Sequence, residues 1–593
     1  MIDIWFHPAL YLLIGGLLLP LFREGVIKKC FIMAVPLVTF MSVIYLHNGI
    51  YGEVRFMDWQ LVFGRVDALS NIFCYIMALM AIIGTLFSLN VEEDWHHVAA
   101  WYYVAGSLGV ILSADYLSLF LFWELMAFAS VFLVWFGGRP DSVASGFRYI
   151  LVHTVGGLFL LAGIILRYYA TDGDLSFVAL NVDAPDLATW LILIGFITNA
   201  AVVPIHSWLS DAYAEASVAG AVFMCAFTTK TAVYVLARGF AGMDILIVLG
   251  GVMALYAIIY GIMENDSRRV FAWDTISQVG YMVLGVGIGT ELAINGACAH
   301  AFAHILYNGL LFMGTGTVIY MTGTAKMTEL GGLYKKMPRT FVYTLIGGLS
   351  IAGIPLMSGF VSKSMIIAAS FETHHIWAAF ALTLASAGTF LLAGVKVPYY
   401  IWFSSKTSSP EIWKKAGDPP WNMQAAMAVA AFFCIFIGCY TPYLYDKLPF
   451  SVHYNPYNAY HLAEALQIAL FTGVAFFFLK KLIKPQPTIS LDLDWFYRMA
   501  GRGFLWLDKR VLQFIDTCVG GIYYYVGLLP LMTISRFWSW FDWHGIDGVV
   551  DGTARTVRGL GGVVRRFQAA QIQYSIFYAV TITALAILIF VIV

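Results

Sequence analysis

The sequence predicts an all-α protein that crosses a membrane many times. Of its 593 residues, 60% are hydrophobic and only 12% are charged, against roughly 25% charged in a soluble domain. Apolar stretches of about 20 residues, the length a helix needs to cross hydrocarbon, recur along most of the chain. A few of them contain single ionisable residues, which are costly in lipid and normally face a protein interior. We therefore expect a bundle of membrane helices with a polar interior.

The apolar stretches number about sixteen. The expected spans are residues 5–22, 27–46, 69–89, 98–114, 116–136, 147–168, 188–208, 217–238, 244–263, 274–290, 294–321, 339–371, 376–404, 422–443, 459–480 and 572–593. The first stretch has no basic leader and no small-residue cleavage site, so it is interpreted as a span and not as a signal peptide.

Loop charges predict the orientation of these spans. Loops after odd-numbered spans carry most of the lysines and arginines, for example Arg268 and Arg269, whereas loops after even-numbered spans carry only Arg55, Arg65 and Lys447. Basic loops stay on the cytoplasmic side of a membrane. We expect a multi-pass protein of the cell membrane with both termini outside.

The C-terminal part of the chain has a different composition. Residues 486–571 interleave Lys, Arg and Asp with aromatic residues such as Trp538 and Trp540. This composition is typical of an amphipathic segment that lies along a membrane or another subunit. We expect a lateral arm on the cytoplasmic side, followed by an anchor helix at 572–593.

Two proline motifs suggest an internal repeat. Pro204 with Trp208 and Pro398 with Trp402 are both Pro-x-x-x-Trp at the end of an apolar helix. Proline removes a backbone donor, and broken helices in membranes line polar cavities. We expect two inverted repeats with broken helices. The expected domains are 1–95 (N-terminal helices), 96–240 and 241–405 (the two repeats), 406–485 (additional helices), 486–571 (the arm) and 572–593 (the anchor).

Five ionisable residues inside the expected spans are the candidate ion pathway. Glu124, Lys230 and Lys396 lie in apolar helices, and His300 and His304 are four residues apart on one helix face. Burial disfavours the charged forms of these groups, so they can exchange protons near neutral pH. The histidine spacing also suits a metal, but no third ligand is evident, so we expect no metal site. His153, His206 and Asp211 are accessory candidates that span ends and polar caps explain equally well.

Three motifs resemble those of a known family. They are Pro204-Ile-His-Ser-Trp-Leu-Ser-Asp211, the run from His300 to Phe312 containing His300-x-x-x-His304, and Gly353-Ile-Pro-Leu-Met-Ser-Gly-Phe-Val-Ser-Lys363. Together they resemble the antiporter-like membrane subunits shared by respiratory complex I (NADH-quinone oxidoreductase) and Mrp-type Na+/H+ antiporters. The similarity covers roughly residues 60–405. The tail, from Trp540 to Tyr574 and a final span, looks like the end of the most distal of the complex I subunits.

The resemblance implies roles for the candidate residues. Glu124 would be the charged partner of the first half-channel, Lys230 a bridging lysine, His300 and His304 part of a central hydrated axis, and Lys396 the lysine of the second half-channel. Two positions depart from the family pattern, because Asn199 and Asn308 stand where the family usually has lysine. Either Lys230 replaces the missing partner of Glu124, or the first half-channel is altered or inactive.

Three functions therefore remain open. The first is a proton-translocating or cation/proton antiporter-like subunit of a multi-subunit complex, with Na+ left open as the coupling ion. The second is a proton-conducting subunit of a redox-driven or CO2/bicarbonate-linked complex, and the third is a structural scaffold with a partly inactive channel. No catalytic centre or cofactor is expected, although the chain could be part of a translocase of the NADH-quinone oxidoreductase type. Other membrane subunits and the lipid bilayer are the expected partners, and the near-zero net charge gives no reason to expect nucleic acid.

Overall fold

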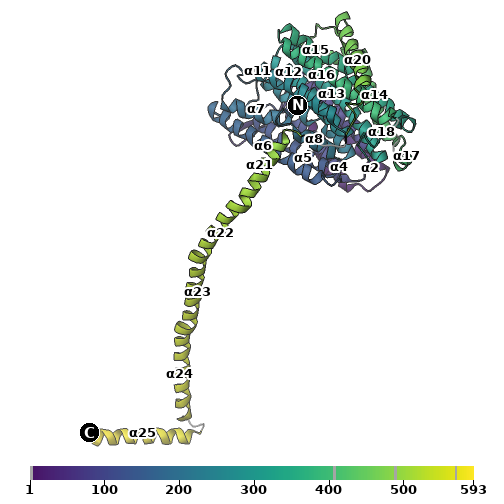
Figure 1. Ribbon diagram of the computed structural model, residues 1–593. Coiled ribbons are helices and arrows are strands. Elements are labelled where there is room, and N and C mark those ends of the chain that lie inside the picture. The colour runs from purple at the N-terminus through teal and green to yellow at the C-terminus, as the bar shows by residue number, and fades with distance from the viewer. Residues whose placement is uncertain (1–4, 405–408, 487–490, 568–570, 593) are drawn as a thin grey trace. The chain divides into compact units, whose positions relative to one another are not determined.

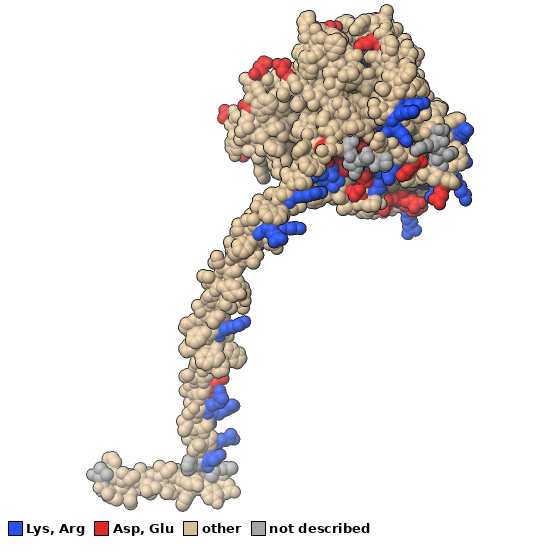
Figure 2. Space-filling model, in the orientation of Figure 1, with Lys and Arg blue, Asp and Glu red and all other residues tan. Residues whose placement is uncertain are grey.

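The computed structural model describes residues 5–404, 409–486, 491–567 and 571–592, and it divides the chain into two units, Met1–Leu493 and Asp494–Val593. The expected domain boundary between residues 405 and 406 lies outside the described residues. In the first unit, helices pack side by side into a bundle (Figure 1). Its charged side chains gather mostly along one edge of the face in view, next to a wide uncharged surface (Figure 2). This distribution fits the expected membrane protein.

The N-terminal part contains the strands of the described chain. Its elements are α1 (Pro8–Leu18), the short 3-10 helix η1 (Leu19–Leu21), α2 (Val26–Ile44), β1 (Gly49–Phe56), β2 (Trp59–Val66) and α3 (Ala68–Ser88). The strands form an antiparallel hairpin in which Phe56 pairs with Trp59, and Met57 in the turn has a φ of 55°. The all-α prediction missed this hairpin, because its residues were interpreted as a loop between two spans.

The central part of the first unit consists of two similar sets of helices. The first set is α4 (Asp94–Leu112), α5 (Tyr116–Trp135), α6 (Ser142–Ala170), α7 (Leu187–Asn199), α8 (Ser207–Glu215), α9 (Val218–Met224) and α10 (Thr228–Gly239). The second set is α11 (Asp244–Met263), α12 (Ser267–Ile288), α13 (Glu291–Thr322), the 3-10 helix η2 (Leu333–Lys335), α14 (Pro338–Ile351), α15 (Ser358–Glu372), α16 (Ile376–Thr389) and the π-helical stretches η3 (Phe390–Lys396) and η4 (Tyr399–Phe403).

Equivalent caps and breaks relate the two sets. Asp115 caps α5 by accepting from the Ser118 N–H, and Asp266, 151 residues later, caps α12 by accepting from the N–H groups of Arg268 and Arg269. The same interval separates the first residues of α7 and α14 and those of α8 and α15. A carboxylate that accepts from the free N–H groups of the first turn stabilises the start of a helix. The two sets therefore follow one local plan.

The second helix break does not lie where Pro398 predicted it. The first break, between α7 and α8, contains Pro204 as expected, but its counterpart is the stretch 352–357 between α14 and α15, which contains Pro355. Around Pro398 the chain stays helical through η3 and η4. A π-helical turn takes up an extra residue, which accommodates a proline without ending the helix.

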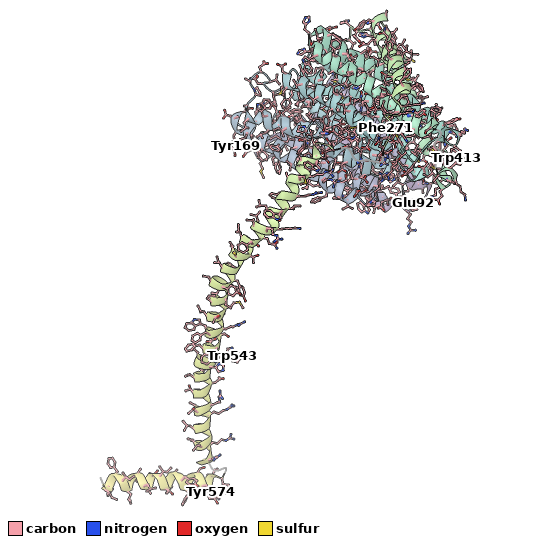
Figure 3. The ribbon with its side chains drawn as sticks, in the orientation of Figure 1. Glu92, Tyr169, Phe271, Trp413, Trp543 and Tyr574 are labelled. Carbon is pink, nitrogen blue, oxygen red and sulfur yellow. The ribbon has the colours of Figure 1, made fainter. Side chains whose placement is uncertain are left out.

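The rest of the chain is helical. The first unit ends with α17 (Pro410–Lys415), α18 (Trp421–Cys439), α19 (Pro442–Tyr445) and α20 (Ala459–Leu479). The second unit contains α21 (Asp494–Leu507), η5 (Asp508–Leu512), α22 (Gln513–Ile522), η6 (Tyr523–Leu528), α23 (Leu529–Phe541), η7 (Asp542–Ile546), α24 (Asp547–Phe567) and α25 (Ile572–Ile592), in which η5, η6 and η7 are π-helical. Side chains such as Trp543 project freely from this unit (Figure 3).

Twelve helices of the described chain are long and apolar enough to cross a membrane, and α7 and the α1–η1 stretch are shorter apolar helices. One of the twelve is the continuous helix Asp494–Arg566, for which the sequence favours a position at the membrane surface. The total of sixteen spans and the lateral position of the arm remain predictions. The chain is nevertheless a multi-pass membrane protein.

Candidate functional site

A buried lysine occupies the helix break of the second repeat. Lys363, on α15, is 3% exposed, and its Nζ donates a hydrogen bond of 2.7 Å to the carbonyl oxygen of Ile351, the last residue of α14. Carbonyls at the end of a helix lack intrahelical donors and carry partial negative charge, so they attract a cation. The broken helix thus supplies the ammonium group with a partner deep in the bundle.

A buried carboxylate faces the same place. Asp274, on α12, is fully buried, and its Oδ1 accepts hydrogen bonds from Gln278 Nε2 at 3.1 Å and Thr389 Oγ1 at 3.2 Å. Asp274 and Lys363 are close enough to interact electrostatically. Buried opposite charges offset their desolvation only with additional hydrogen bonds, and these two groups have them.

The two candidate histidines of α13 extend this cluster towards the first repeat. His300 Nδ1 lies 2.9 Å from Ser362 Oγ, and the Tyr307 hydroxyl lies 3.4 Å from His300 Nε2. Neither ring nitrogen of the buried His304 has a hydrogen-bond partner among the described residues. His304 is within electrostatic range of both Lys230 and Lys363. It therefore lies between the lysines of the two repeats.

Lys230, on α10, repeats the arrangement at Lys363. It is fully buried, and its Nζ donates a 2.6 Å hydrogen bond to the carbonyl oxygen of Cys225, at the end of α9. Within the described residues, no ion pair joins Lys230 to Glu124. The structure thus gives Lys230 a backbone partner in place of the carboxylate expected from the sequence.

Glu124, on α5, faces a glycine of α6. A Cβ at Gly157 would lie 2.1 Å from Glu124 Oε1, so only glycine leaves room for the carboxyl group at its present position. The side chain is half-buried, and Oε1 has no hydrogen-bond partner among the described residues. One turn away on α6, His153 Nδ1 lies 2.8 Å from Asn199 Oδ1. Asn199 is therefore a hydrogen-bonded part of this cluster.

Two other candidates have ordinary polar partners. Asn308 Nδ2 donates to Thr275 Oγ1 at 3.0 Å. Lys396 is buried, and its Nζ donates to the carbonyl oxygens of Ile262 at 2.6 Å and Glu264 at 2.8 Å, at the C-terminal end of α11. A cation is stabilised at this end of a helix. Lys396 thus lies beside the end of another helix and not beside a break in its own.

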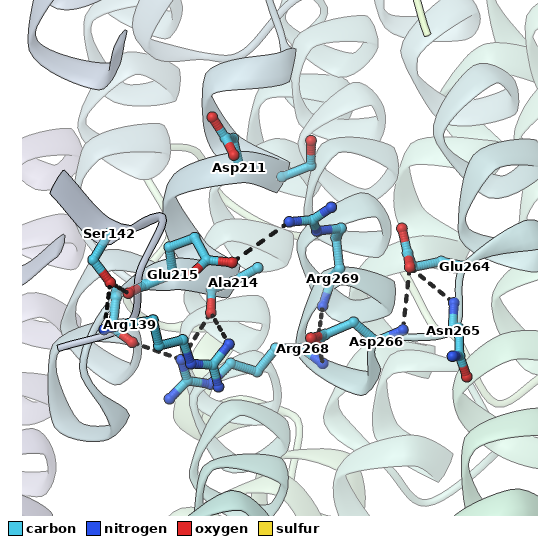
Figure 4. A network of polar contacts seen from close by, with 12 residues as sticks. Arg139, Ser142, Asp211, Ala214, Glu215, Glu264, Asn265, Asp266, Arg268 and Arg269 are labelled. Atoms are coloured by element: carbon cyan, nitrogen blue, oxygen red, sulfur yellow. Dashed lines mark hydrogen bonds and ion pairs between the residues drawn. The ribbon is translucent and has the colours of Figure 1, made fainter. Parts of the chain in front are cut away.

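A network of arginines holds the end of α8 (Figure 4). Arg139 and Arg268 both donate to the carbonyl oxygen of Ala214, at 3.0 Å and 3.2 Å, and Arg269 lies 3.7 Å from Glu215. The accessory candidate Asp211, earlier on α8, forms an ion pair of 2.5 Å with Arg148. These contacts join the loops before α6 and α12 to the helix that follows the first break.

His206 lies in the first break and contacts the segment that follows α20. Its Nε2 lies 3.4 Å from Asp492 Oδ2, while the Tyr256 hydroxyl donates to Asp492 Oδ1 at 2.5 Å. The Tyr260 hydroxyl donates to the carbonyl oxygen of Leu491 at 2.9 Å. The chain just before α21 is therefore attached to the first break and to α11.

Sequence reasoning missed Lys363 and Asp274. Lys363 was visible as a lysine inside the expected span 339–371, but the break that gives it a partner was not anticipated. The expected span 274–290 placed Asp274 at its edge, whereas α12 begins at Ser267 and carries Asp274 two turns inward. Among the described residues, no group of three or more His, Cys, Asp or Glu side chains is arranged to hold a metal. The assembled groups are suited to holding and passing protons.

Comparison with known proteins supports the resemblance seen in the motifs. Residues 113–389 match the family described as NADH:quinone oxidoreductase/Mrp antiporter, TM. The chain is 28% identical over 443 residues to one of the proteins that make up the Na(+)/H(+) antiporter of Alkalihalophilus pseudofirmus, a match covering 69% of this chain and 89% of that protein. It is 26% identical over 455 residues to NADH-ubiquinone oxidoreductase chain 5 of Phytophthora infestans, covering 70% and 67% respectively.

A solved structure shares the fold. A chain of the Mrp complex from Dietzia sp. DQ12-45-1b superposes with a TM-score of 0.65 and 21% sequence identity, covering 79% of this chain and 98% of that chain. The expected family resemblance is confirmed by these matches.

Proposed function

Because residues 113–389 match the NADH:quinone oxidoreductase/Mrp antiporter family, we propose that the chain is a proton-translocating or cation/proton antiporter-like subunit of a multi-subunit membrane complex. The observation that carries this proposal is the position of His304 within electrostatic range of Lys230 and Lys363. Protons move along Glu124, Lys230, His304, His300 and Lys363, with Asp274 balancing the charge on Lys363. Lys396 holds a proton at the end of α11, near the cytoplasmic loops.

The proposed topology follows from the repeat. Five crossings separate α4 from α11 if the broken pairs α7–α8 and α9–α10 each cross once, so the second set is inverted relative to the first. Basic loops such as the one carrying Arg268 and Arg269 face the cytoplasm of a cell-membrane protein, and both termini lie outside. The helix from Asp494 forms the lateral arm on the cytoplasmic side and α25 forms its anchor.

The test is transport by the assembled complex in sealed vesicles. Glu124→Gln and Lys230→Ala should each reduce proton transport strongly, and the double variant should be little worse than either single one, because groups that act as a unit are non-additive. Lys336→Ala, at an exposed loop position, is the matched control and should transport normally. Normal transport by Glu124→Gln would favour the scaffold function for the first repeat.

The redox-driven alternative keeps one specific support, namely the match to NADH-ubiquinone oxidoreductase chain 5. The scaffold alternative is weakened because Asn199 and Asn308, which replace the lysines expected from the family, both have hydrogen-bond partners in the polar interior. The proteins that copurify in mild detergent distinguish an antiporter assembly from a redox complex. Deleting residues 494–593 should release partner subunits, since the ionisable residues of the pathway all precede them.

A further inference from the structure

A cavity connects the second helix break to α20. Three groups of residues line it: Ala352, Gly353 and Ile354 in the break, Lys363 and Ser364 on α15, and His461 and Glu464 on α20, among others. Its volume for water is about 40 Å³, and one water needs roughly 10–15 Å³, so the cavity has room for two or three molecules. Lys363 and Glu464 thus share one space that is large enough for a short chain of water.

The polar groups on α20 are held in place by their neighbours. His461 Nδ1 lies 3.9 Å from Glu464 Oε2, and the Tyr454 hydroxyl lies 3.1 Å from His461 Nε2. The Thr383 hydroxyl, on α16, donates to Glu464 Oε1 at 3.4 Å. The side chains of His461 and Glu464 are 11% and 22% exposed, whereas Lys363 is almost fully buried. Exposure therefore increases from the lysine towards α20.

The sequence of α20 indicates to which side this path leads. The helix is apolar enough to cross a membrane, and it runs from His461 near its start to the basic residues Lys480, Lys481 and Lys484 just after its end. Basic residues stay on the cytoplasmic side, so the end that carries His461 and Glu464 faces the outside. Ionisable groups on such a helix are costly in lipid and mark ion routes.

We propose that Glu464 and His461 form, with Lys363, a water-connected proton site that opens to the outer side of the membrane. This inference rests on the proposed transport function and names the outer access site of its second repeat. The Glu464 carboxylate takes a proton from the Lys363 ammonium through the intervening water and exchanges it with the outer solution. The neighbouring His461 orients the carboxylate and offers a second exchange group.

The first test is proton transport by the assembled complex in vesicles. Glu464→Gln, which cannot take up a proton, should reduce the rate at least about tenfold, since a positioned proton-transfer group contributes on the order of 10² or more. Glu464→Asp should retain at least half of the rate. The matched control is Gln467→Ala, one turn further on the exposed face of α20, which should transport normally.

The outcomes separate this inference from the function itself. Normal transport by Glu464→Gln, together with loss of transport in Lys363→Ala, overturns the access site and leaves the function standing. Normal transport in both variants overturns the proposed function as well.

The second test measures access and does not depend on transport. In a chain whose exposed Cys30, Cys439 and Cys518 are replaced by serine, Ser364→Cys lines the cavity, while Ser370→Cys, buried on the same helix, does not. A membrane-impermeant thiol reagent added outside should label Ser364→Cys at least about tenfold faster than Ser370→Cys, following solvent exposure. Equal labelling, or labelling from the cytoplasmic side alone, overturns the outer access route even if Glu464→Gln is inactive.

Discussion

The two repeats share one backbone plan but differ in their charges. His153 and His304 occupy the same position of the plan, 151 residues apart, yet His153 is bonded to Asn199 while His304 lies within reach of two ammonium groups. In the second repeat Asp274 and Lys363 are both enclosed. In the first repeat, Glu124 is half-buried beside a glycine and has no ion-pair partner among the described residues.

This difference shows that helix order and charge placement are separate properties. A broken helix provides free carbonyls wherever it occurs, and Lys230 and Lys363 both use them. Whether a carboxylate also faces the lysine depends on one side chain of a neighbouring helix. The same fold can therefore hold a paired site and an unpaired site, which should differ in their tolerance of substitution.

The largest expected effect is the loss of Lys363. Lys363→Ala should lower proton transport by about 100-fold or more, in the range of a removed proton-transfer group. It also leaves Asp274 as an unpaired buried charge, which costs about 3–5 kcal/mol of stability when a buried pair is broken. The double variant Lys363→Ala/Asp274→Asn should recover much of the stability and none of the transport. Thermal unfolding and vesicle transport measure the two effects, and transport by the double variant would exclude Lys363 from the pathway.

The equivalent histidines should respond unequally. His304→Ala removes the group between the two lysines, so we expect transport to fall by about 10–100-fold. His153→Ala removes a ring that is bonded to a neutral amide, and we expect a change of less than about threefold at this position. The two variants are matched in chemistry and in place within the repeat. Equal losses in vesicle transport would contradict the division into a charged and a less charged half.

The room beside Glu124 can be tested without changing any ionisable group. Gly157→Ala places a methyl group 2.1 Å from the present position of Glu124 Oε1, so the carboxyl group must rotate away. The cost in stability should be small, because the end of a flexible side chain can move. Misplacement of a transfer group by about 1 Å can cost up to 100-fold in rate, and we expect about a tenfold loss of transport.

Gly173→Ala, in the exposed loop after α6, is a control for the added methyl group. Normal transport by Gly157→Ala would mean that the position of the Glu124 carboxyl group does not limit transport.

The smallest expected effect concerns the attachment of residues 491–493 to the first break. Burial alone would raise the pKa of Asp492, but His206 and Tyr256 outweigh it and hold this pKa below its ordinary value of 3.8. A carboxylate with a lowered folded pKa stabilises the structure above its unfolded pKa, and this stability is lost as pH falls through the folded pKa. Amide exchange of residues 491–493 should therefore stay slow from about pH 8 to about pH 4.

Asp492→Asn should speed exchange in this segment across the whole range, because the amide cannot replace the charge. Release of the wild-type segment at about pH 6 would mean that a group other than Asp492 controls the attachment.

Much of the helical structure followed from apolar length alone. Each expected span overlaps a helix because the bilayer admits few other structures, and loop charges and motifs indicated the family. The candidate residues Glu124, Lys230, His300 and His304 were found because single charges in apolar helices are conspicuous. The hairpin at 49–66 was missed, since short strands outside the membrane leave no comparable signal.

The sequence by itself thus determined the class of protein, the family and most of the buried ionisable residues, since composition and helix length decide what a bilayer accepts. The tertiary structure decided which of these residues meet. It moved the second break from Pro398 to residues 352–357, brought Lys363 and Asp274 together, and placed Lys396 at the end of α11. Such pairings depend on how separate helices pack, and no local pattern along the chain records the distance between two side chains on different helices.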